Sequence, residues 1–270
     1  MTRLVVVVGT MAALGGQVIP ASVPASAMST VAHGTPVPNG RYPFAVQLTM
    51  TKIPRTDGTS YDSACSAALV SAWWIITAGH CFHDVDRNPL SGPVPYTTTA
   101  TLGRSDLSSS TGAVVSVVSV VQSSATDLAL AKLARPVKYI TPLPLARVAP
   151  HRGDVVTIAG WGSTTDVDPA PSTHLQSGRF TVSSITATTV GVVGYRPSRD
   201  TSACLYDSGA PYFSASPHGK PALVGVESTG PACPHTTEET TSRVDNLFSW
   251  IHSVICGNGG SERQGLRAAL

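Results

Sequence analysis

Hydrophobic and polar residues alternate along most of the chain in short runs, and the three-to-four-residue spacing of an amphipathic helix is scarce. The runs are rich in β-branched residues and end at Gly, Pro, Ser or Asp, as strands do. They cover Phe44–Thr49, Ala67–Ile76, Thr97–Leu102, Val114–Val121, Leu128–Leu133, Val155–Ala159, Arg179–Val182, Thr189–Val193 and Ala222–Val226. This pattern predicts an all-β fold, either a sandwich or a barrel.

One stretch near the end of the chain, from Val244 to Ile255, has the spacing of an amphipathic helix instead. Gly257 follows this stretch and is predicted to end the helix, because glycine is the usual residue after a helix C-terminus. We expect residues 257–270 to form a flexible tail. The apolar residues that share one helical face are Val244, Leu247, Phe248, Ile251 and Ile255.

The first residues have the features of a secretory signal. Met1-Thr2-Arg3 carries a positive charge, the segment from Leu4 to Leu14 is apolar, and Ala25-Ser26-Ala27 fits a cleavage site. The apolar run is too short to span about 30 Å of hydrocarbon. We therefore expect residues 1–27 to be a signal peptide and the mature protein to be extracellular, with no membrane association after signal removal.

Composition and charge fit a globular secreted protein. The chain has 270 residues, of which 42% are hydrophobic and 13% charged, with a net charge of +2 and no basic cluster. Nothing in this charge pattern indicates nucleic acid or an anionic membrane as a partner.

A segment with four prolines, Arg135–Pro150, lies where a linker between two β domains would be. It suggests domains over residues 31–145 and 146–256.

The five cysteines leave at least one unpaired within the chain. Cys65 and Cys81 form a local pair in the sequence, as do Cys204 and Cys233, and export would permit a disulfide within each pair. Cys256 is then left either as a reduced thiol or for an intermolecular disulfide.

Three segments carry candidate chemistry: Thr77–Cys81 (TAGHC), Thr126–Leu130 (TDLAL) and Cys204–Pro211 (CLYDSGAP). Each has an ordinary explanation alone, since a lone histidine, a capping aspartate and an Asp-Ser-Gly turn are common. Together they give the order His, Asp, Ser, which is one of the known orders of the nucleophilic triad and differs from that of the α/β-hydrolases. The His80–His83 segment lacks a further pair of ligands at zinc-site spacing, so no metal and no cofactor is expected.

These segments resemble motifs of the trypsin/chymotrypsin family of serine proteases. TAGHC is similar to its histidine motif, TDLALAKL to its aspartate motif, AGWG (Ala159–Gly162) to its mid-chain turn and DSGAP to its serine motif. The resemblance runs from about Val31 to Ile255. It implies two six-stranded antiparallel β-barrels around a cleft, with a C-terminal helix, and a serine endopeptidase that acts on proteins or peptides.

The resemblance also implies the catalytic roles. His80 would take the proton from Ser208, and Asp127 would fix the imidazole tautomer. The backbone N–H groups of Tyr206 and Ser208 would form the oxyanion hole. Tyr206 stands where the family has glycine, and a Cβ disfavours the backbone angles that glycine adopts there. A flipped peptide at Tyr206 would place a carbonyl where an N–H is needed.

Two readings of the mature N-terminus stay open. Val31-Ala32-His33-Gly34-Thr35 resembles the start of the family's active enzymes, with His33 in place of a glycine. Residues 28–30 would then be a short propeptide, and the new α-amino group of Val31 would pair with Asp207. Alternatively, signal cleavage leaves Met28 as the first residue, and Asp207 has another partner.

The resemblance places the substrate pocket at Ser202, Ser228, Thr229, Gly230 and Glu239. Ser202 stands where trypsin-like enzymes carry an acid, and Thr229 replaces an aromatic residue. Glu239 would narrow the pocket, supply a charge for a basic side chain, or lie exposed in a loop. The preference for a substrate side chain is therefore open.

A second hypothesis comes from these departures. A protease homologue with impaired catalysis that binds a protein partner through the same cleft would tolerate Tyr206, Thr229 and His33. The intact set of His80, Asp127 and Ser208 favours the enzyme.

Overall fold

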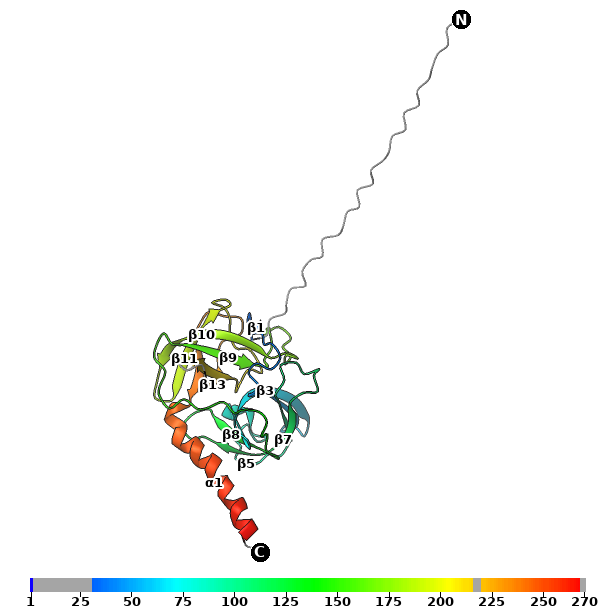
Figure 1. Cartoon of the computed structure of the whole chain (residues 1–270). Coiled ribbons are helices and arrows are strands. Elements are labelled where there is room, and N and C mark those ends of the chain that lie inside the picture. Colours follow the sequence, from blue (N-terminus) through cyan, green and yellow to red (C-terminus); the bar gives the residue numbers. More distant parts are fainter. Residues whose placement is uncertain (2–30, 216–219, 268–270) are drawn as a thin grey trace.

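The computed structural model describes Met1, residues 31–215 and residues 220–267, with the side chains of Ala215 and residues 258–267 left out. The predicted signal peptide, apart from Met1, and the predicted propeptide 28–30 lie outside the described residues. Two groups of antiparallel strands lie one above the other in Figure 1, with the C-terminal helix beside the lower group.

The first group of strands closes into a barrel. Its strands follow the order β5-β7-β6-β2-β3-β4-β8, and β7 also pairs with β8, which closes a ring of six to which β5 is added. The bounds are β2 Ala45–Pro54, β3 Ser60–Ser71, β4 Trp74–Thr77, β5 Gly92–Pro93, β6 Thr97–Leu102, β7 Ala113–Gln122 and β8 Ala129–Leu133.

The second group closes in the same way. Its order is β1-β10-β11-β14-β13-β12-β9, and β10 also pairs with β9, so six strands form a ring and β1 lies outside it. The bounds are β1 Thr35–Pro36, β9 Val155–Gly160, β10 Gln176–Ile185, β11 Thr189–Arg196, β12 Pro211–Ala215, β13 Pro221–Thr229 and β14 Glu239–Arg243. The predicted fold of two six-stranded antiparallel barrels is confirmed.

Alternation of side chains gives each barrel its core. In β7 the side chains of Ala113, Val115 and Val117 are buried while Val114 and Ser116 are exposed, as a period of two requires. In β10 the buried positions include Phe180 and Val182. One hydrophobic cluster fills the first barrel and extends to Phe213, Leu223 and Val226 of the second, and a separate cluster lies within the second barrel.

Some strand predictions were wrong in detail. The run Ala67–Ile76 is two strands rather than one, because a turn at Ala72 and Trp73 separates β3 from β4. Strands β12 and β14 and the two-residue strands β1 and β5 had no prediction. In β14 the buried side chains Glu239, Thr241 and Ser242 are polar, so hydrophobic alternation gave no signal there.

The helix was predicted too short. The 3₁₀ turn η2 (Asp245–Leu247) leads into α1 (Phe248–Arg267), which continues past Gly257. Gly257 does not adopt the left-handed conformation that ends a helix, and a glycine inside a helix costs only about 0.5–1 kcal/mol relative to alanine. The start of α1 packs on the first barrel's core, where Ile251 is fully buried.

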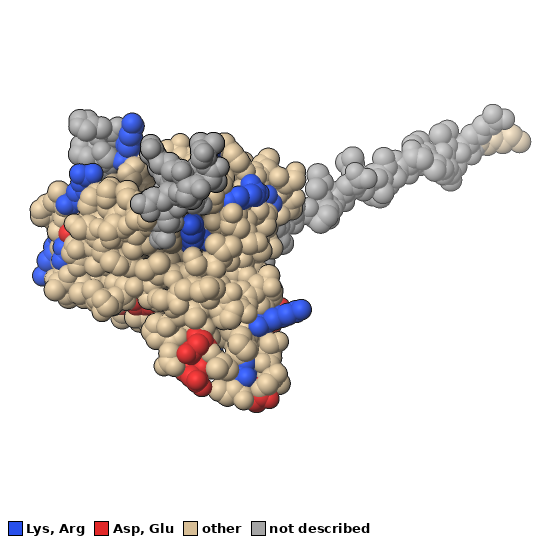
Figure 2. Space-filling model, turned by 90° about the horizontal axis from the view of Figure 1, so that it is seen from below, with Lys and Arg blue, Asp and Glu red and all other residues tan. Residues whose placement is uncertain are grey.

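The proline-rich segment 135–150 crosses between the barrels. The Leu143 N–H donates to the Leu69 carbonyl in the first barrel (2.8 Å), and the Ala146 N–H donates to Leu223 in the second (2.8 Å). Charged side chains are sparse on the face shown in Figure 2, where most of the surface is uncharged. No helix in the described ranges is long and apolar enough to cross a membrane.

Candidate active site

His80 lies in a short 3₁₀ turn, η1 (Gly79–Cys81), directly after β4. The Cys65–Cys81 disulfide ties this turn to β3. The Gln122 side-chain amide donates to the carbonyls of Gly79 (2.9 Å) and Phe82 (3.0 Å) on either side of the histidine. These contacts fix the backbone from which the imidazole projects.

Asp127 lies just before β8 and accepts three hydrogen bonds through its carboxylate. The donors are the His80 Nδ1 (2.8 Å), the His80 backbone N–H (2.7 Å) and the Ser228 hydroxyl (2.6 Å). Burial raises the pKa of Asp127, but the hydrogen bonds and charge of His80 and the bond from Ser228 outweigh it, so the pKa lies below its usual value. An ionised carboxylate accepts only, so the proton of this His80 tautomer is on Nδ1.

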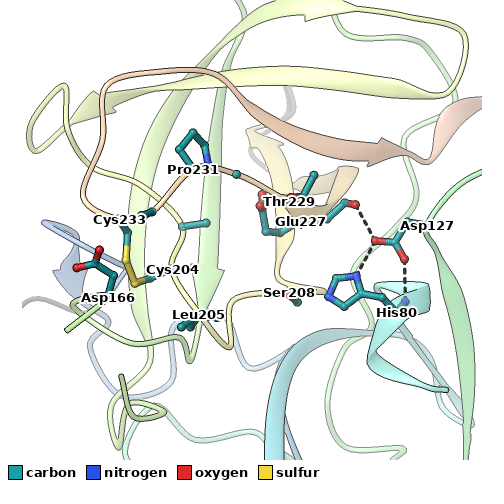
Figure 3. Close-up of a pocket in the computed structure, with 14 residues that line it drawn as sticks. His80, Asp127, Asp166, Cys204, Leu205, Ser208, Glu227, Thr229, Pro231 and Cys233 are labelled. Atoms are coloured by element: carbon teal, nitrogen blue, oxygen red, sulfur yellow. Dashed lines mark hydrogen bonds and ion pairs between the residues drawn. A yellow bond between two sulfur atoms is a disulfide. The ribbon is translucent and has the colours of Figure 1, made fainter. Parts of the chain in front are cut away.

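Ser208 lies in the loop between Cys204 and β12, on the second barrel. Figure 3 shows it beside the imidazole of His80, on the side of the ring away from Asp127. A cavity of about 580 Å³ is lined by all three residues, together with Ser228 to Cys233 from the end of β13 and the segment that follows it. The two barrels therefore bring together a base, an acid that orients it and a hydroxyl.

Tyr206 adopts a conformation that glycine would favour, with φ at +74°. Such a φ at a residue with a Cβ costs about 1–3 kcal/mol. The carbonyl of Leu205 accepts from the Ser163 N–H (2.7 Å), so in this trans peptide the Tyr206 N–H points away from Ser163. Within the described part of the chain, the N–H groups of Tyr206 and Ser208 donate to no other group.

Asp207 is fully buried and holds two backbone N–H groups, those of Gly162 (2.8 Å) and Cys204 (3.0 Å). Burial, with a smaller contribution from the nearby Glu239, raises the pKa of Asp207 to about 7 against the effect of these two hydrogen bonds. No cation among the residues described pairs with Asp207.

Val31 is also fully buried, in the hydrophobic cluster of the second barrel. Ala32 forms an antiparallel bridge with Ser202, and the Thr201 hydroxyl donates to the His33 carbonyl (3.0 Å). The segment that begins at Val31 is thus built into the barrel that carries Asp207. Thirty residues precede Val31 in this chain, so its nitrogen is an uncharged amide.

The predicted pocket residues divide into two groups. Ser228, Thr229 and Gly230 line the cavity. Ser202 and Glu239 are fully buried and lie behind it, so Glu239 is not an exposed loop acid.

Glu239 is held by several partners behind the cavity wall. Its carboxylate accepts from the Ala203 N–H (2.6 Å) and the Tyr212 hydroxyl, and it lies 3.4 Å from His235 Nε2.

The structure adds two residues that the sequence interpretation missed. Ser66 on β3 donates its backbone N–H to the Ser208 carbonyl (2.8 Å) and its hydroxyl to the Tyr206 carbonyl (3.2 Å). Glu227 lines the cavity one residue before Ser228. Glu227 follows the apolar run Ala222–Val226 in β13, which was a weak signal, whereas Ser66 has several other polar residues beside it in β3 and had none.

The cysteines form two disulfides, Cys65–Cys81 and Cys204–Cys233, as predicted. Cys256 is free and exposed on α1. In the described residues, no group of three or more His, Cys, Asp and Glu side chains is arranged to hold a metal ion.

A sequence model of the trypsin family matches residues 31–251, most of the chain. The chain belongs to the trypsin family of serine proteases. This membership supports a peptidase function at the level of the family.

Three relatives of this chain are named as proteases. A trypsin-like protease of Streptomyces glaucescens is 29% identical over 231 residues, which are 79% of this chain and 78% of that protein. Transmembrane protease serine 7 of Mus musculus is 26% identical over 252 residues, 85% of this chain but 29% of the mouse protein. Serine protease 56 of Mus musculus is 27% identical, over 89% of this chain and 41% of its own length. The chain thus spans less than half the length of these two mouse relatives.

Proposed function

We propose that this chain is a secreted serine endopeptidase in which Ser208 attacks the peptide carbonyl. A serine hydroxyl is a poor nucleophile until a base removes its proton. His80 takes that proton as Ser208 Oγ bonds to the carbonyl carbon, and then gives it to the leaving amine. Water hydrolyses the acyl-enzyme by the same steps in reverse order. The observation that carries this proposal is the 2.8 Å hydrogen bond from His80 Nδ1 to Asp127 at the edge of a cavity that Ser208 also lines.

The N–H groups of Tyr206 and Ser208 are proposed as the donors that stabilise the oxyanion. Two preorganised donors are needed where the negative charge develops. Support comes from the Leu205 carbonyl, which is engaged by Ser163 and leaves the Tyr206 N–H on the other side of the peptide. Tyrosine in place of glycine then strains the backbone, but the N–H donor is kept.

We further propose that cleavage before Val31 activates the enzyme. The new ammonium group at Val31 would give the buried Asp207 carboxylate a cation, which it lacks among the residues that the structure describes. Ionising a buried carboxyl without a partner is costly, so an ammonium nearby favours the charged form. Mass analysis of the secreted protein distinguishes Val31 from Met28 as the mature N-terminus.

Secretion agrees with the two disulfides, which form and persist in oxidising compartments. The substrate class is a protein or peptide, and no cofactor takes part in the proposed steps.

The rival function is binding of a protein partner by an impaired homologue. The strained Tyr206 and the replacement of an aromatic residue by Thr229 favour it. Labelling by a fluorophosphonate tests the two functions directly, because the reagent needs an activated serine.

Protein that has a verified Val31 N-terminus should be labelled at Ser208, and the variants Ser208→Ala and His80→Ala should not. Absence of labelling in the cleaved protein would overturn the endopeptidase proposal. Labelling without hydrolysis of any peptide would favour the rival.

A further inference from the structure

Ser66 forms hydrogen bonds with three residues of the active-site region, Trp161, Tyr206 and Ser208. It is fully buried on β3, in the first barrel. The Trp161 N–H donates to Ser66 Oγ (2.9 Å), and Ser66 Oγ donates its own proton to the Tyr206 carbonyl (3.2 Å). The Ser66 backbone N–H meanwhile donates to the Ser208 carbonyl (2.8 Å).

The Tyr206 carbonyl is the group whose orientation accompanies the unusual φ of +74°. A residue with a Cβ prefers negative φ. Rotation of the chain that follows the Tyr206 Cα to negative φ would break the bond from Ser66 to this carbonyl, whereas a flip of the Leu205–Tyr206 peptide would break the bond from Ser163 to the Leu205 carbonyl. The hydroxyl of Ser66 therefore opposes the turn that Tyr206 would otherwise favour. A glycine at position 206 would have no such preference and would need no such partner.

We propose that Ser66 is a positioning residue whose hydroxyl holds Tyr206 in a glycine-like conformation and so keeps the Tyr206 N–H directed at the oxyanion. This inference rests on the proposed function. It explains how tyrosine is accommodated at this point of the loop, and it makes a hydroxyl on the first barrel necessary only because residue 206 is not glycine.

A double-mutant cycle of Ser66→Ala and Tyr206→Gly tests the proposal. Ser66→Ala should lower kcat by about 10- to 100-fold with little change in KM, which is less than the roughly 100- to 1000-fold loss expected when an oxyanion donor is removed completely. In the Tyr206→Gly background, Ser66→Ala should change kcat less than about threefold. Equal losses in both backgrounds would overturn the proposal, because Ser66 would then act through folding or through Ser208.

A readout without catalysis separates this inference from the function on which it rests. Ser66→Ala should lower the melting temperature more when residue 206 is tyrosine than in the Tyr206→Gly background, even when measured in Ser208→Ala protein. Ser66→Gly also removes the hydroxyl and should repeat the pattern. If the coupling in melting temperature is present but no variant with Ser208 is labelled by fluorophosphonate, the function fails and the conformational inference stands. If the two mutations are additive in both readouts, the inference fails.

An independent observation concerns the cavity itself. Glu227 is 3% exposed and lines the cavity, and its Oε2 has no hydrogen-bond partner among the described residues. Figure 3 shows Glu227 and Thr229 together on β13, between the Cys204–Cys233 disulfide and the His80–Asp127 pair. The acids lining this cavity are Asp127, Asp166 and Glu227, and no lysine or arginine of the described chain lines it.

Several groups around Glu227 affect its charge. Burial, the carboxylates of Glu239 and Asp207, and more weakly Asp127 raise the pKa of Glu227 well above its usual value, while a hydrogen bond with Tyr212 opposes them. A histidine contacts the same group of acids, since His235 Nε2 lies 3.4 Å from Glu239 Oε1. These surroundings favour the neutral form of the Glu227 carboxyl. A cation that binds in the cavity beside it would favour the anionic form instead.

We infer that Glu227 selects substrates with a lysine or arginine side chain in this cavity and releases a proton when such a side chain binds. This inference also rests on the proposed function. The acid is supplied from β13, whereas Ser202 is neutral and its hydroxyl accepts from the His235 N–H (3.3 Å).

The test uses p-aminobenzamidine as a cationic probe, because its binding needs no catalysis. Its dissociation constant should fall as pH rises from about 5 to 8, and Glu227→Gln should weaken binding at least tenfold and remove the pH dependence. With peptide substrates, Glu227→Gln should lower kcat/KM for lysine against leucine at least tenfold. An unchanged lysine-to-leucine ratio together with unchanged probe binding would overturn the inference. Probe binding that depends on Glu227, without any peptide hydrolysis, would leave the inference intact and remove the enzyme function.

Discussion

The buried carboxylate of Asp207 is held by the backbone N–H of Gly162 at 2.8 Å, inside the second barrel and next to the candidate nucleophile. Gly162 belongs to the AGWG turn, about forty-five positions earlier in the chain. Among the described residues this buried carboxyl accepts hydrogen bonds but pairs with no cation. Its protonation therefore makes the stability of the protein depend on pH.

The uncleaved Ser208→Ala protein should lose stability as pH rises from about 4 to 7. Below about pH 4 the Asp207 carboxyl is protonated in both the folded and the unfolded chain. Between about pH 4 and pH 7 the unfolded chain loses the Asp207 proton while the folded chain keeps it, so folding becomes less favourable as the pH rises. The shift from 3.8 to about 7 corresponds to about 4 kcal/mol at most. Urea unfolding across this pH range measures the free energy.

Asp207→Asn should flatten this slope, leaving a remainder with the same sign from Glu227. The protein cleaved before Val31 should also show a smaller slope, because its ammonium favours the ionised carboxylate. A slope that is the same in precursor, cleaved protein and Asp207→Asn would contradict the role given to Asp207.

Gly162→Ala should destabilise the protein by about 1–3 kcal/mol. A Cβ at this position would overlap both carboxylate oxygens of Asp207, whose side chain is fully buried. Gly257→Ala is the matched control, because a Cβ there meets open space within α1. The control should be neutral or slightly stabilising in thermal unfolding. Equal effects at the two positions would count against the packing argument.

Ser228→Ala should move the acid limb of the kcat/KM profile to higher pH. Its hydroxyl donates to the Asp127 carboxylate at 2.6 Å, and without this bond the carboxylate holds the His80 imidazolium more strongly. Ser242→Ala is the control, since its hydroxyl donates to the Asp127 backbone carbonyl (2.7 Å) and not to the carboxylate. A pH profile of peptide hydrolysis should separate the two variants. A shift of the same size in both would show that packing around Asp127, and not the hydrogen bond to its carboxylate, sets the limb.

Replacing Cys65 and Cys81 by serine should cost about 3 kcal/mol, because the disulfide closes a loop with a sequence separation of 16. Activity should fall as well, since His80 is next to Cys81. Cys256→Ser should change neither stability nor activity, because this exposed thiol lies on α1, away from the cavity lining. Chemical unfolding and peptide hydrolysis test both statements.

The sequence by itself determined most of the strands, the barrel pair through its family motifs, both disulfides and the three residues proposed for catalysis. Alternation, turn residues and short motifs are local signals, and each is complete within a few positions. Local signals were insufficient for β14, whose buried face is polar, and for α1, which runs through a glycine that nothing forces into a left-handed turn.

The tertiary structure decided what those residues contact. Ser66 and Tyr206 are 140 positions apart, and no pattern in either segment indicates that one hydroxyl reaches the other carbonyl. The sequence left open whether Glu239 narrows the pocket, supplies a charge there or lies exposed beside Glu238, whereas strand pairing buries it against Tyr212 and Ala203. The direction of the Tyr206 peptide and the environment of Glu227 depend on atoms from several strands at once. A hydrogen bond or a buried charge is a property of that three-dimensional neighbourhood, so only the folded chain fixes it.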